Sequence, residues 1–167
     1  MNQSVLNREI EAKFMVSQLP INWETNPHEF LEQGYVLASP NHSLRLRRIG
    51  DRFVQTIKTG QGLNRLEVEI ELTQAQFQAL WPLTQSKRLT KTRYAIPIAG
   101  NLVAELDIYH GSLKGLMTVE VEFETEDQYH QFIRGALPSW FGKEVTGDSK
   151  FVNQNLALNG WPQKAGD

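Results

Sequence analysis

The sequence predicts an α+β protein built around an antiparallel sheet, and three observations support this fold class. Charged and apolar residues alternate with a period of two in six segments, as in Glu9-Ile10-Glu11-Ala12-Lys13. Turn residues such as Gly50-Asp51 separate these segments. Helical patterns lie between and after the strands, where helices can cover an apolar face. The observations together favour a sheet with one apolar side packed against helices.

The predicted strands follow one another along most of the chain. Alternation predicts strands over residues 8–16, 43–49, 52–59, 63–72, 87–98, 102–109 and 118–124. The strand over 118–124 is expected to be the last, and residues 34–39 are expected to be extended. Residues 43–49 and 52–59 form a hairpin, because Gly50-Asp51 suits a two-residue turn. Pro40-Asn41-His42, Gly60-Gln61-Gly62 and Gly100-Asn101 are turns between other strands.

Four helices are expected around this sheet. After a loop over 20–26, we expect a short helix over 27–33. Thr73 is a good N-cap for a helix that runs to about Leu83 with an apolar side. Further helices are expected over 126–137 and 149–159, the second at the C-terminal end of the chain. Residues 1–167 are interpreted as one domain, a length that permits a substantial core.

The charged faces carry many groups of both signs. Residues two positions apart share one face of a strand, and in five segments such residues carry charges of the same sign. These groups are Arg45 and Arg47; Glu67, Glu69 and Glu71; Lys91 and Arg93; Glu105 and Asp107; and Glu120, Glu122 and Glu124. A solvated face of an open antiparallel sheet explains any single strand of this kind. The whole set favours bound ions, because neighbouring carboxylates repel unless a cation lies between them and clustered basic groups suit an anion. Closure into a barrel with a polar interior is therefore our hypothesis.

Composition excludes several classes of function. Lysine plus arginine is 17 and aspartate plus glutamate is 19, a net charge of 17 − 19 = −2, which argues against bulk electrostatic binding to DNA or RNA. Cysteine is absent, so disulfides, thiolate zinc sites and a cysteine nucleophile are excluded, and a reducing compartment fits. There is no apolar run of signal-peptide type and none of the about 20 residues that a membrane span needs. We expect a cytoplasmic protein without membrane partners.

An ordered series of motifs resembles the CYTH superfamily, also called triphosphate tunnel metalloenzymes. The series contains Glu9-x-Glu11-x-Lys13, Gln33-Gly34-Tyr35, Leu44-Arg45-Leu46-Arg47, Thr56-Ile57-Lys58, Arg65-Leu66-Glu67-Val68-Glu69, Lys91-Thr92-Arg93-Tyr94, Glu105-Leu106-Asp107-Ile108-Tyr109, Gly115-Leu116, Glu120-Val121-Glu122-Phe123 and the tail from Val145 to Phe151. The resemblance implies a closed eight-stranded antiparallel β-barrel, or tunnel, with flanking helices and a C-terminal helix. It also implies that basic residues bind a triphosphate and acidic residues bind a divalent metal.

The resemblance assigns roles to individual residues. Metal binding falls to Glu9, Glu11, Glu120 and Glu122, with Glu67 and Glu69 for a second metal or for the attacking water. Substrate contacts fall to Lys13, Arg45, Arg47, Lys58, Arg65, Lys91, Arg93 and Lys150, with Arg65 and Asp107 as residues that orient a neighbour. Glu69, Lys91 and Arg93 are the expected catalytic groups, the last two stabilising the leaving pyrophosphate. Glu71, Glu105 and Glu124 are interpreted as solvated strand-end charges, and Arg48, Arg52 and Lys87 as surface charges. Carboxylate oxygens suit Mg²⁺ or Mn²⁺.

The predicted activity is metal-dependent hydrolysis of inorganic tripolyphosphate to pyrophosphate and phosphate. The segment Gln33-Gly34-Tyr35-Val36-Leu37 resembles the branch of short tripolyphosphatases. Two alternatives stay open: a non-catalytic protein that binds polyphosphate or a nucleotide, and a class IV adenylyl cyclase or an organic triphosphatase acting on thiamine triphosphate or a nucleotide. Paired carboxylates favour the enzyme over the binder, because a binder would not need so many. The sequence leaves a homodimer open as well as a monomer.

Overall fold

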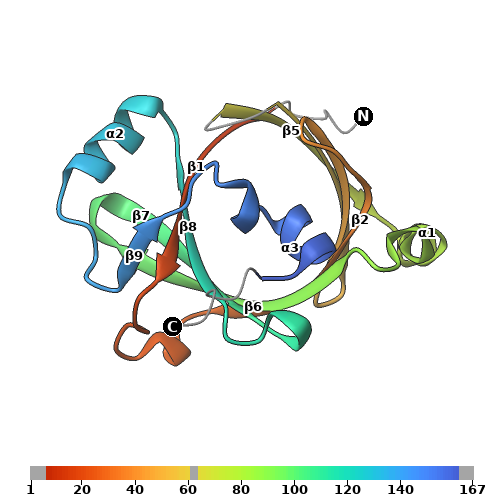
Figure 1. The fold of residues 1–167 in the computed structure, drawn as a ribbon, viewed down its shortest axis with the longest axis horizontal. Coiled ribbons are helices and arrows are strands. Elements are labelled where there is room, and N and C mark those ends of the chain that lie inside the picture. Colours follow the sequence, from red (N-terminus) through yellow and green to blue (C-terminus); the bar gives the residue numbers. More distant parts are fainter. Residues whose placement is uncertain (1–6, 61–63, 162–167) are drawn as a thin grey trace.

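Eight antiparallel strands run in a ring around a central space (Figure 1). The structure is a computed structural model that describes residues 7–60 and 64–161. Its sheet has the order β5-β4-β3-β2-β6-β7-β8-β1-β9, and β1 pairs with β5 as well as with β8. The strands are β1 (Asn7–Val16), β2 (His28–Ala38), β3 (His42–Ile49), β4 (Arg52–Thr59), β5 (Asn64–Leu72), β6 (Arg88–Ile98), β7 (Leu102–Tyr109), β8 (Met117–Phe123) and β9 (Phe141–Glu144). The pairing of β1 with β5 joins the ends of the eight-strand series and closes the barrel.

Strand β1 changes partner along one edge. Its first half pairs with β5, where Asn7 to Ile10 face Glu67 to Asn64. Its second half pairs with β9, where Phe14 faces Glu144 and Val16 faces Phe141. Because β9 occupies this edge, the chain that follows it starts beside one end of the barrel.

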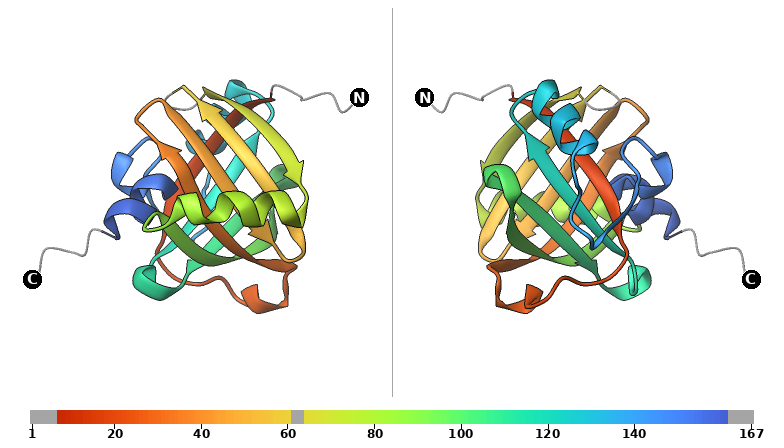
Figure 2. Two further views of the ribbon diagram at one scale, coloured as in Figure 1. Left: turned by 90° about the vertical axis from the view of Figure 1, so that its right-hand side faces the viewer. Right: turned by 90° about the vertical axis from the view of Figure 1, so that its left-hand side faces the viewer.

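The helices occupy three positions around the barrel. Helix α1 (Gln74–Leu80), continued by the 3-10 helix η2 (Trp81–Thr84), and helix α2 (Glu126–Arg134) lie outside the ring on opposite sides (Figure 1). Helix α3 (Asn153–Asn159), preceded by the 3-10 helix η5 (Ser149–Phe151), lies at one end of the barrel in both side views (Figure 2). Three further 3-10 helices, η1 (Trp23–Thr25), η3 (Ala99–Asn101) and η4 (Gly111–Leu113), lie in connections. Among the described residues, no helix is both long and apolar enough to cross a membrane.

The main hydrophobic core lies outside the barrel, under α2 and β9. Its fully buried members include Ala12, Leu106 and Val119, which alternate with inward-facing charged residues on their strands. Phe132 of α2 and Phe141 of β9 cover them. Burial of apolar surface at about 25 cal/mol per Å² stabilises this outward packing and leaves the charged faces no direction but inward.

A smaller core forms where α3 meets the barrel end. Leu156 of α3 packs with Leu89 and Tyr109 of the barrel strands and with Leu113 and Leu116 of the following connection. The helix is thereby held against the strand ends rather than free beside them.

Most predicted elements are confirmed, including the hairpin of β3 and β4 and the capping of α1 by Thr73. The Thr73 hydroxyl accepts a hydrogen bond from the backbone of Gln76, whose side chain accepts one from the Thr73 backbone. The predicted turn at Gly60-Gln61-Gly62 lies partly outside the described residues. The barrel has the predicted eight strands, with β9 added at the edge of β1.

Two predictions about elements are wrong. Residues 27–33 are not a helix, because 28–33 belong to strand β2, which pairs with β3 on one side and β6 on the other. Two flanking strands satisfy its backbone groups, and this tertiary pairing outweighs a weak local preference. Residues 118–124 do not contain the last strand, since β9 follows. That strand has only four residues, one of them a glycine, and is too short to show an alternating pattern.

Gly34 marks the place where η2 meets the sheet most closely. A Cβ atom at this position would lie 2.6 Å from Cβ of Thr84, closer than real Cβ contacts. The missing side chain therefore lets η2 pack directly on β2, which anchors the α1 segment to the outer wall.

Candidate functional site

The inward faces of the strands line a cavity of about 810 Å³. It brings together most of the residues predicted for the site, namely Glu9, Glu11, Lys13, Arg45, Arg47, Lys58, Glu67, Glu69, Arg93, Glu120 and Glu122. Glu105 and Asp148 also line it. Among the described residues, the wall thus carries eight carboxylates and five lysine or arginine side chains, a formal balance of 5 − 8 = −3. Bound cations would offset this negative balance and strengthen the binding of a polyanion.

Three carboxylates form a cluster that fits a divalent cation. One oxygen from each of Glu9, Glu11 and Glu122 can be chosen so that all lie within 4.8 Å of one another. Glu11 and Glu122 are directly paired across β1 and β8. Partial removal from water, followed by the nearby charges of Glu105 and Glu9, raises the pKa of Glu122 to about 7. Such crowding is relieved by a cation, and hard oxygen donors suit Mg²⁺ or Mn²⁺.

Lys58 links this acidic cluster to strand β5. Its ammonium donates to both carboxylate oxygens of Glu9, at 2.8 and 2.7 Å, and lies 2.8 Å from Oε2 of Glu67. Lys58 and then Arg45 lower the pKa of Glu67, although burial opposes its ionisation. The acidic cluster and the basic wall are therefore in direct contact in this structure.

A chain of ion pairs crosses strands β1, β8, β7 and β6. Glu120 lies 3.0 Å from the Lys13 ammonium and 2.5 Å from the Arg93 guanidinium. Arg93 also donates to both oxygens of Asp107, each at 2.7 Å, and pairs with Glu105. Lys13 and Arg93 hold the pKa of Glu120 well below its usual range although burial opposes its ionisation. The predicted metal ligand Glu120 is thus bound to cationic side chains here, and its role as a ligand stays a prediction.

Lys91 ends this chain behind the cavity wall. Its side chain is 1% exposed, it does not line the cavity, and it donates to Asp107 at 2.5 Å. Burial and then the charge of Arg93 lower the pKa of Lys91 to about 8, against the opposing effect of Asp107. Asp107 therefore orients both Lys91 and Arg93, and direct contact of Lys91 with substrate stays a prediction.

Arg45 and Arg47 form the part of the wall best suited to an anion. Within the described part of the chain, the Nε atoms of both guanidinium groups are buried without a hydrogen-bond partner. Arg45 and then burial lower the pKa of Arg47 to about 10, and Arg93 adds to this effect. A phosphate group in the cavity would relieve the repulsion between the three guanidinium groups.

The C-terminal segment covers part of the cavity. The backbone of Val145 donates to the Lys13 carbonyl at 2.8 Å, and the Lys13 backbone donates to the Thr146 hydroxyl at 2.9 Å. Gln154 of α3 donates to the Ser39 carbonyl at 3.0 Å. Residues 145–149 and 151–155 line the cavity, whereas Lys150 is exposed and does not. The contact predicted for Lys150 stays a prediction.

Sequence reasoning missed several residues of the site. Glu105, interpreted as a solvated strand-end charge, instead lines the cavity and pairs with Arg93. The register of β6 and β7 sets Arg93 opposite Asp107, which lies two residues from Glu105 on the same face of β7. Tyr35 lines the cavity with a hydroxyl that accepts a hydrogen bond from Gln33. Gln33 and Tyr35 are two residues apart, so a strand at this point would have placed both side chains on one face. The side chain of Arg65 lies outside the described residues.

Most of the remaining charges lie at the surface, as predicted. Lys87 differs, because its side chain is partly buried and its ammonium donates to the Val36 carbonyl at 3.0 Å. Glu71 is exposed and lies 3.4 Å from Arg52, and Glu124 is exposed. Arg48 is exposed and lies 3.6 Å from Glu32.

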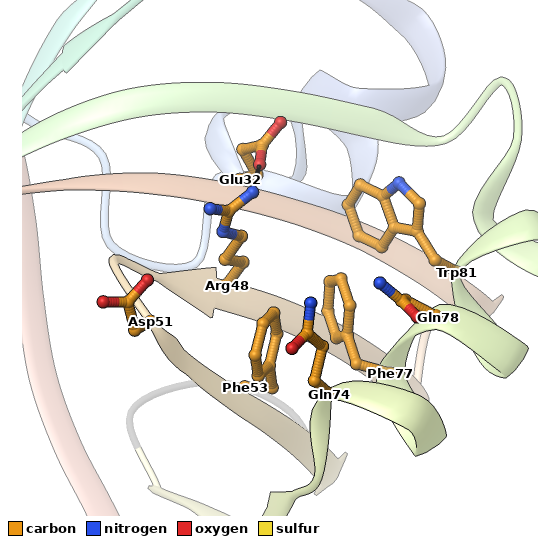
Figure 3. Close-up of a pocket in the computed structure, with 8 residues that line it drawn as sticks. All are labelled: Glu32, Arg48, Asp51, Phe53, Gln74, Phe77, Gln78 and Trp81. Atoms are coloured by element: carbon orange, nitrogen blue, oxygen red, sulfur yellow. Dashed lines mark ion pairs between the residues drawn. The ribbon is translucent and has the colours of Figure 1, made fainter.

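A second pocket of about 480 Å³ lies outside the barrel, between the β3–β4 hairpin and α1 (Figure 3). The Phe53 ring meets Phe77 at a tilt, and Phe77 stacks on Trp81, with centroid distances of 4.8 and 4.9 Å. Arg48 at its edge is paired with Glu32. Aromatic rings and a neutralised arginine contrast with the charged tunnel, so this pocket does not share the chemistry of the site.

The barrel and its lining define a class of protein, one with a tunnel that combines a carboxylate cluster and an arginine wall. The chain belongs to the CYTH domain family, which matches residues 7–136. It is 44% identical over 154 residues to an inorganic triphosphatase of Nitrosomonas europaea, covering 90% of this chain and 97% of the relative. An inorganic triphosphatase of Acetivibrio thermocellus is 31% identical over 156 residues, covering 92% and 96%. The crystal structure of the inorganic triphosphatase NE1496 superposes with a TM-score of 0.66 at 40% identity, covering 90% of this chain and 94% of that chain.

Proposed function

We propose that this protein hydrolyses inorganic tripolyphosphate to pyrophosphate and phosphate with the help of a divalent metal. The observation that carries the proposal is the tunnel wall, where the guanidinium groups of two arginines line the same cavity as a cluster of carboxylates. The names of the two curated relatives, both inorganic triphosphatases, support the same activity. Among the described residues, the lining offers side-chain charges rather than a broad aromatic surface, which fits a substrate made of phosphate alone.

Glu9, Glu11 and Glu122 are the residues that would hold the metal, with Glu67 and Glu69 beside them. Mg²⁺ or Mn²⁺ fits the donor set, because all its donors are carboxylate oxygens. The metal would neutralise charge on the phosphate chain and act as a Lewis acid. Lys58 bridges Glu9 and Glu67 in the structure, and we infer that it would turn toward substrate phosphate if these carboxylates held a cation.

Arg45 and Arg47 bind the phosphate chain through their guanidinium groups, which line the cavity, and Lys13 and Arg93 add positive charge to the tunnel. Glu69 accepts the proton of a water molecule, whose oxygen attacks the terminal phosphorus in line. The bond from that phosphorus to the bridging oxygen breaks, and pyrophosphate leaves with the electron pair. Arg93 stabilises the charge on the leaving group, held in place by Asp107. Phosphoryl transfer depends mainly on positioning and charge, which a rigid barrel supplies.

The test is phosphate release from tripolyphosphate, ATP and thiamine triphosphate in parallel, with Mg²⁺, Mn²⁺ or chelator. We expect release from tripolyphosphate that requires metal, with little from the other two. Tight tripolyphosphate binding without release would favour the non-catalytic binder. Cyclic nucleotide and pyrophosphate from ATP would favour the cyclase, and release chiefly from an organic triphosphate would favour that class of triphosphatase.

A matched pair of variants tests the role of Glu69. Glu69→Gln removes the proton acceptor and should lower kcat about 100-fold or more. Glu71→Gln is the control, because Glu71 lies two residues further on the same strand, is exposed, and does not line the cavity. Equal activity of the two variants would contradict the role of Glu69. We also propose a cytoplasmic location, which the absence of cysteine supports.

A further inference from the structure

Thr56 occupies the centre of a row of side chains that crosses four strands inside the barrel. Tyr35 of β2 pairs with Arg45 of β3, Arg45 pairs with Thr56 of β4, and Thr56 pairs with Glu69 of β5. Directly paired residues point to the same face of a sheet. Thr56 has no exposed surface and does not itself line the cavity, whereas Arg45 and Glu69 do. Its hydroxyl therefore lies behind the residues that meet the substrate.

The hydroxyl of Thr56 connects a cation to an anion. Nη2 of Arg45 donates to Oγ1 of Thr56 at 3.1 Å, and Oγ1 donates to Oε2 of Glu69 at 3.3 Å. The direction of both bonds is determined by chemistry, because a guanidinium can only donate and a carboxylate can only accept. A single hydroxyl proton thus points at Glu69 whenever Arg45 is in place.

Both partners of Thr56 also line the cavity. Nε of Arg45 has no hydrogen-bond partner in the described structure, although it is buried. For Glu69, the contacts found within residues 7–60 and 64–161 all go to Oε2, from Thr56 and from Arg47 at 3.4 Å. The row thus holds one atom of each group in place, while both residues line the cavity.

We propose that Thr56 is a positioning residue, which holds the proton-accepting carboxylate of Glu69 in a set position relative to the phosphate bound by Arg45. This inference rests on the proposed function. The hydroxyl is the group that matters, because valine has the same shape and the same strand preference but can neither accept from Arg45 nor donate to Glu69.

The experiment compares Thr56→Val, Thr56→Ser and the control Thr59→Val. Thr59 lies three residues along β4, on the opposite face, so its variant repeats the chemical change outside the barrel. Steady-state kinetics with Mn²⁺ gives kcat and KM for tripolyphosphate. Calorimetry in chelator gives the Kd of tripolyphosphate without metal, which reports on Arg45 independently of turnover. Thr56→Ala replaces Thr56→Val if the valine variant does not fold.

We expect Thr56→Val to lower kcat about 10- to 100-fold, the range found when a partner of a functional side chain is removed. We also expect weaker tripolyphosphate binding, with both parameters restored to within about threefold by Thr56→Ser and unchanged in Thr59→Val. In a Glu69→Gln background, Thr56→Val should have little further effect on kcat, because residues that act as a unit are not additive.

Three results would overturn the inference. Thr56→Val could lower Tm while kcat and Kd stay at wild-type values, or Thr56→Ser could be as impaired as Thr56→Val, or the effects of Thr56→Val and Glu69→Gln on kcat could be fully additive. A wild-type protein that releases no phosphate would refute the proposed function instead, and the Kd values would then decide. Weaker binding in Thr56→Val that serine restores would support the positioning of Arg45, and equal binding would overturn it.

Discussion

Replacement of Asp107 by asparagine tests the buried ion-pair chain most directly. Asp107 has no exposed surface and accepts three hydrogen bonds, two from Arg93 at 2.7 Å and one from Lys91 at 2.5 Å. Asparagine keeps the shape of the side chain but removes its charge. Arg93 keeps Glu120 and Glu105 as partners, whereas Lys91 loses the only carboxylate it pairs with among the described residues.

The size of the stability loss follows from the unpaired charge of Lys91. Removal of one partner from a buried ion pair costs about 3–5 kcal/mol. The lower end applies here, because the pKa of Lys91 is already about 8 and falls further without Asp107, so that the amine can become neutral near pH 7. We expect the free energy of unfolding to drop by about 3 kcal/mol and Tm to fall by about 6–12 °C.

The pH dependence of this deficit has a definite sign. A lysine whose pKa is lower in the folded state destabilises the protein fully below that pKa, and the penalty disappears as the pH rises toward the unfolded value of 10.5. In the wild type this recovery starts at about pH 8, and in Asp107→Asn it starts lower. The difference between the two proteins should therefore shrink as the pH rises from about 6 to 8.

Urea unfolding at pH 6, 7 and 8 measures the deficit, and Lys91→Met supplies the second arm of a double-mutant cycle. Asp107→Asn combined with Lys91→Met contains no stranded ammonium and should be more stable than Asp107→Asn alone, with a coupling energy of about 1–3 kcal/mol. A deficit below about 1 kcal/mol, or one that is additive with Lys91→Met and independent of pH, would refute the reasoning.

Three further predictions concern the metal cluster, the arginine wall and the outer packing. Because the pKa of Glu122 is raised to about 7, Mn²⁺ affinity measured by titration should increase from pH 6 to 8. Glu122→Gln should bind Mn²⁺ more weakly, and its affinity should depend less on pH. A pH dependence as steep as that of the wild type would contradict this prediction. Metal-free Glu122→Gln should also be more stable than wild type at pH 8, because a raised carboxyl pKa reduces stability as the pH rises from 4.5 through 7. Arg45→Met should weaken tripolyphosphate binding about 10- to 100-fold in calorimetry. Tm should not fall, because the substitution also removes the repulsion between Arg45 and Arg47. A large loss of Tm would show instead that Arg45 is structural. Gly34→Ala should lower the free energy of unfolding by about 1–3 kcal/mol, since the new methyl group meets Thr84, while KM stays unchanged; full wild-type stability would mean that η2 can move away.

The strand pattern and the identity of most site residues could be predicted from the sequence. Alternation places Glu9, Glu11 and Lys13 on one face whatever the strand pairs with, because side-chain direction is a local property of extended backbone. Short or mixed segments were not predictable in this way. Strand β2 depends in part on β6, and the four-residue strand β9 depends on β1; these partners satisfy backbone groups and are distant in the sequence.

The sequence by itself determined which charges share a face, and the ordered motifs indicated the family. The tertiary structure decided how these charges pair. Asp107 meets Arg93, Glu120 meets Lys13, and Thr56 links Arg45 to Glu69 because strand register sets residues opposite one another across the barrel. Register depends on turns, a bulge in β2 and the closure of β1 onto β5, so contacts between strands cannot be predicted from alternation along any one of them.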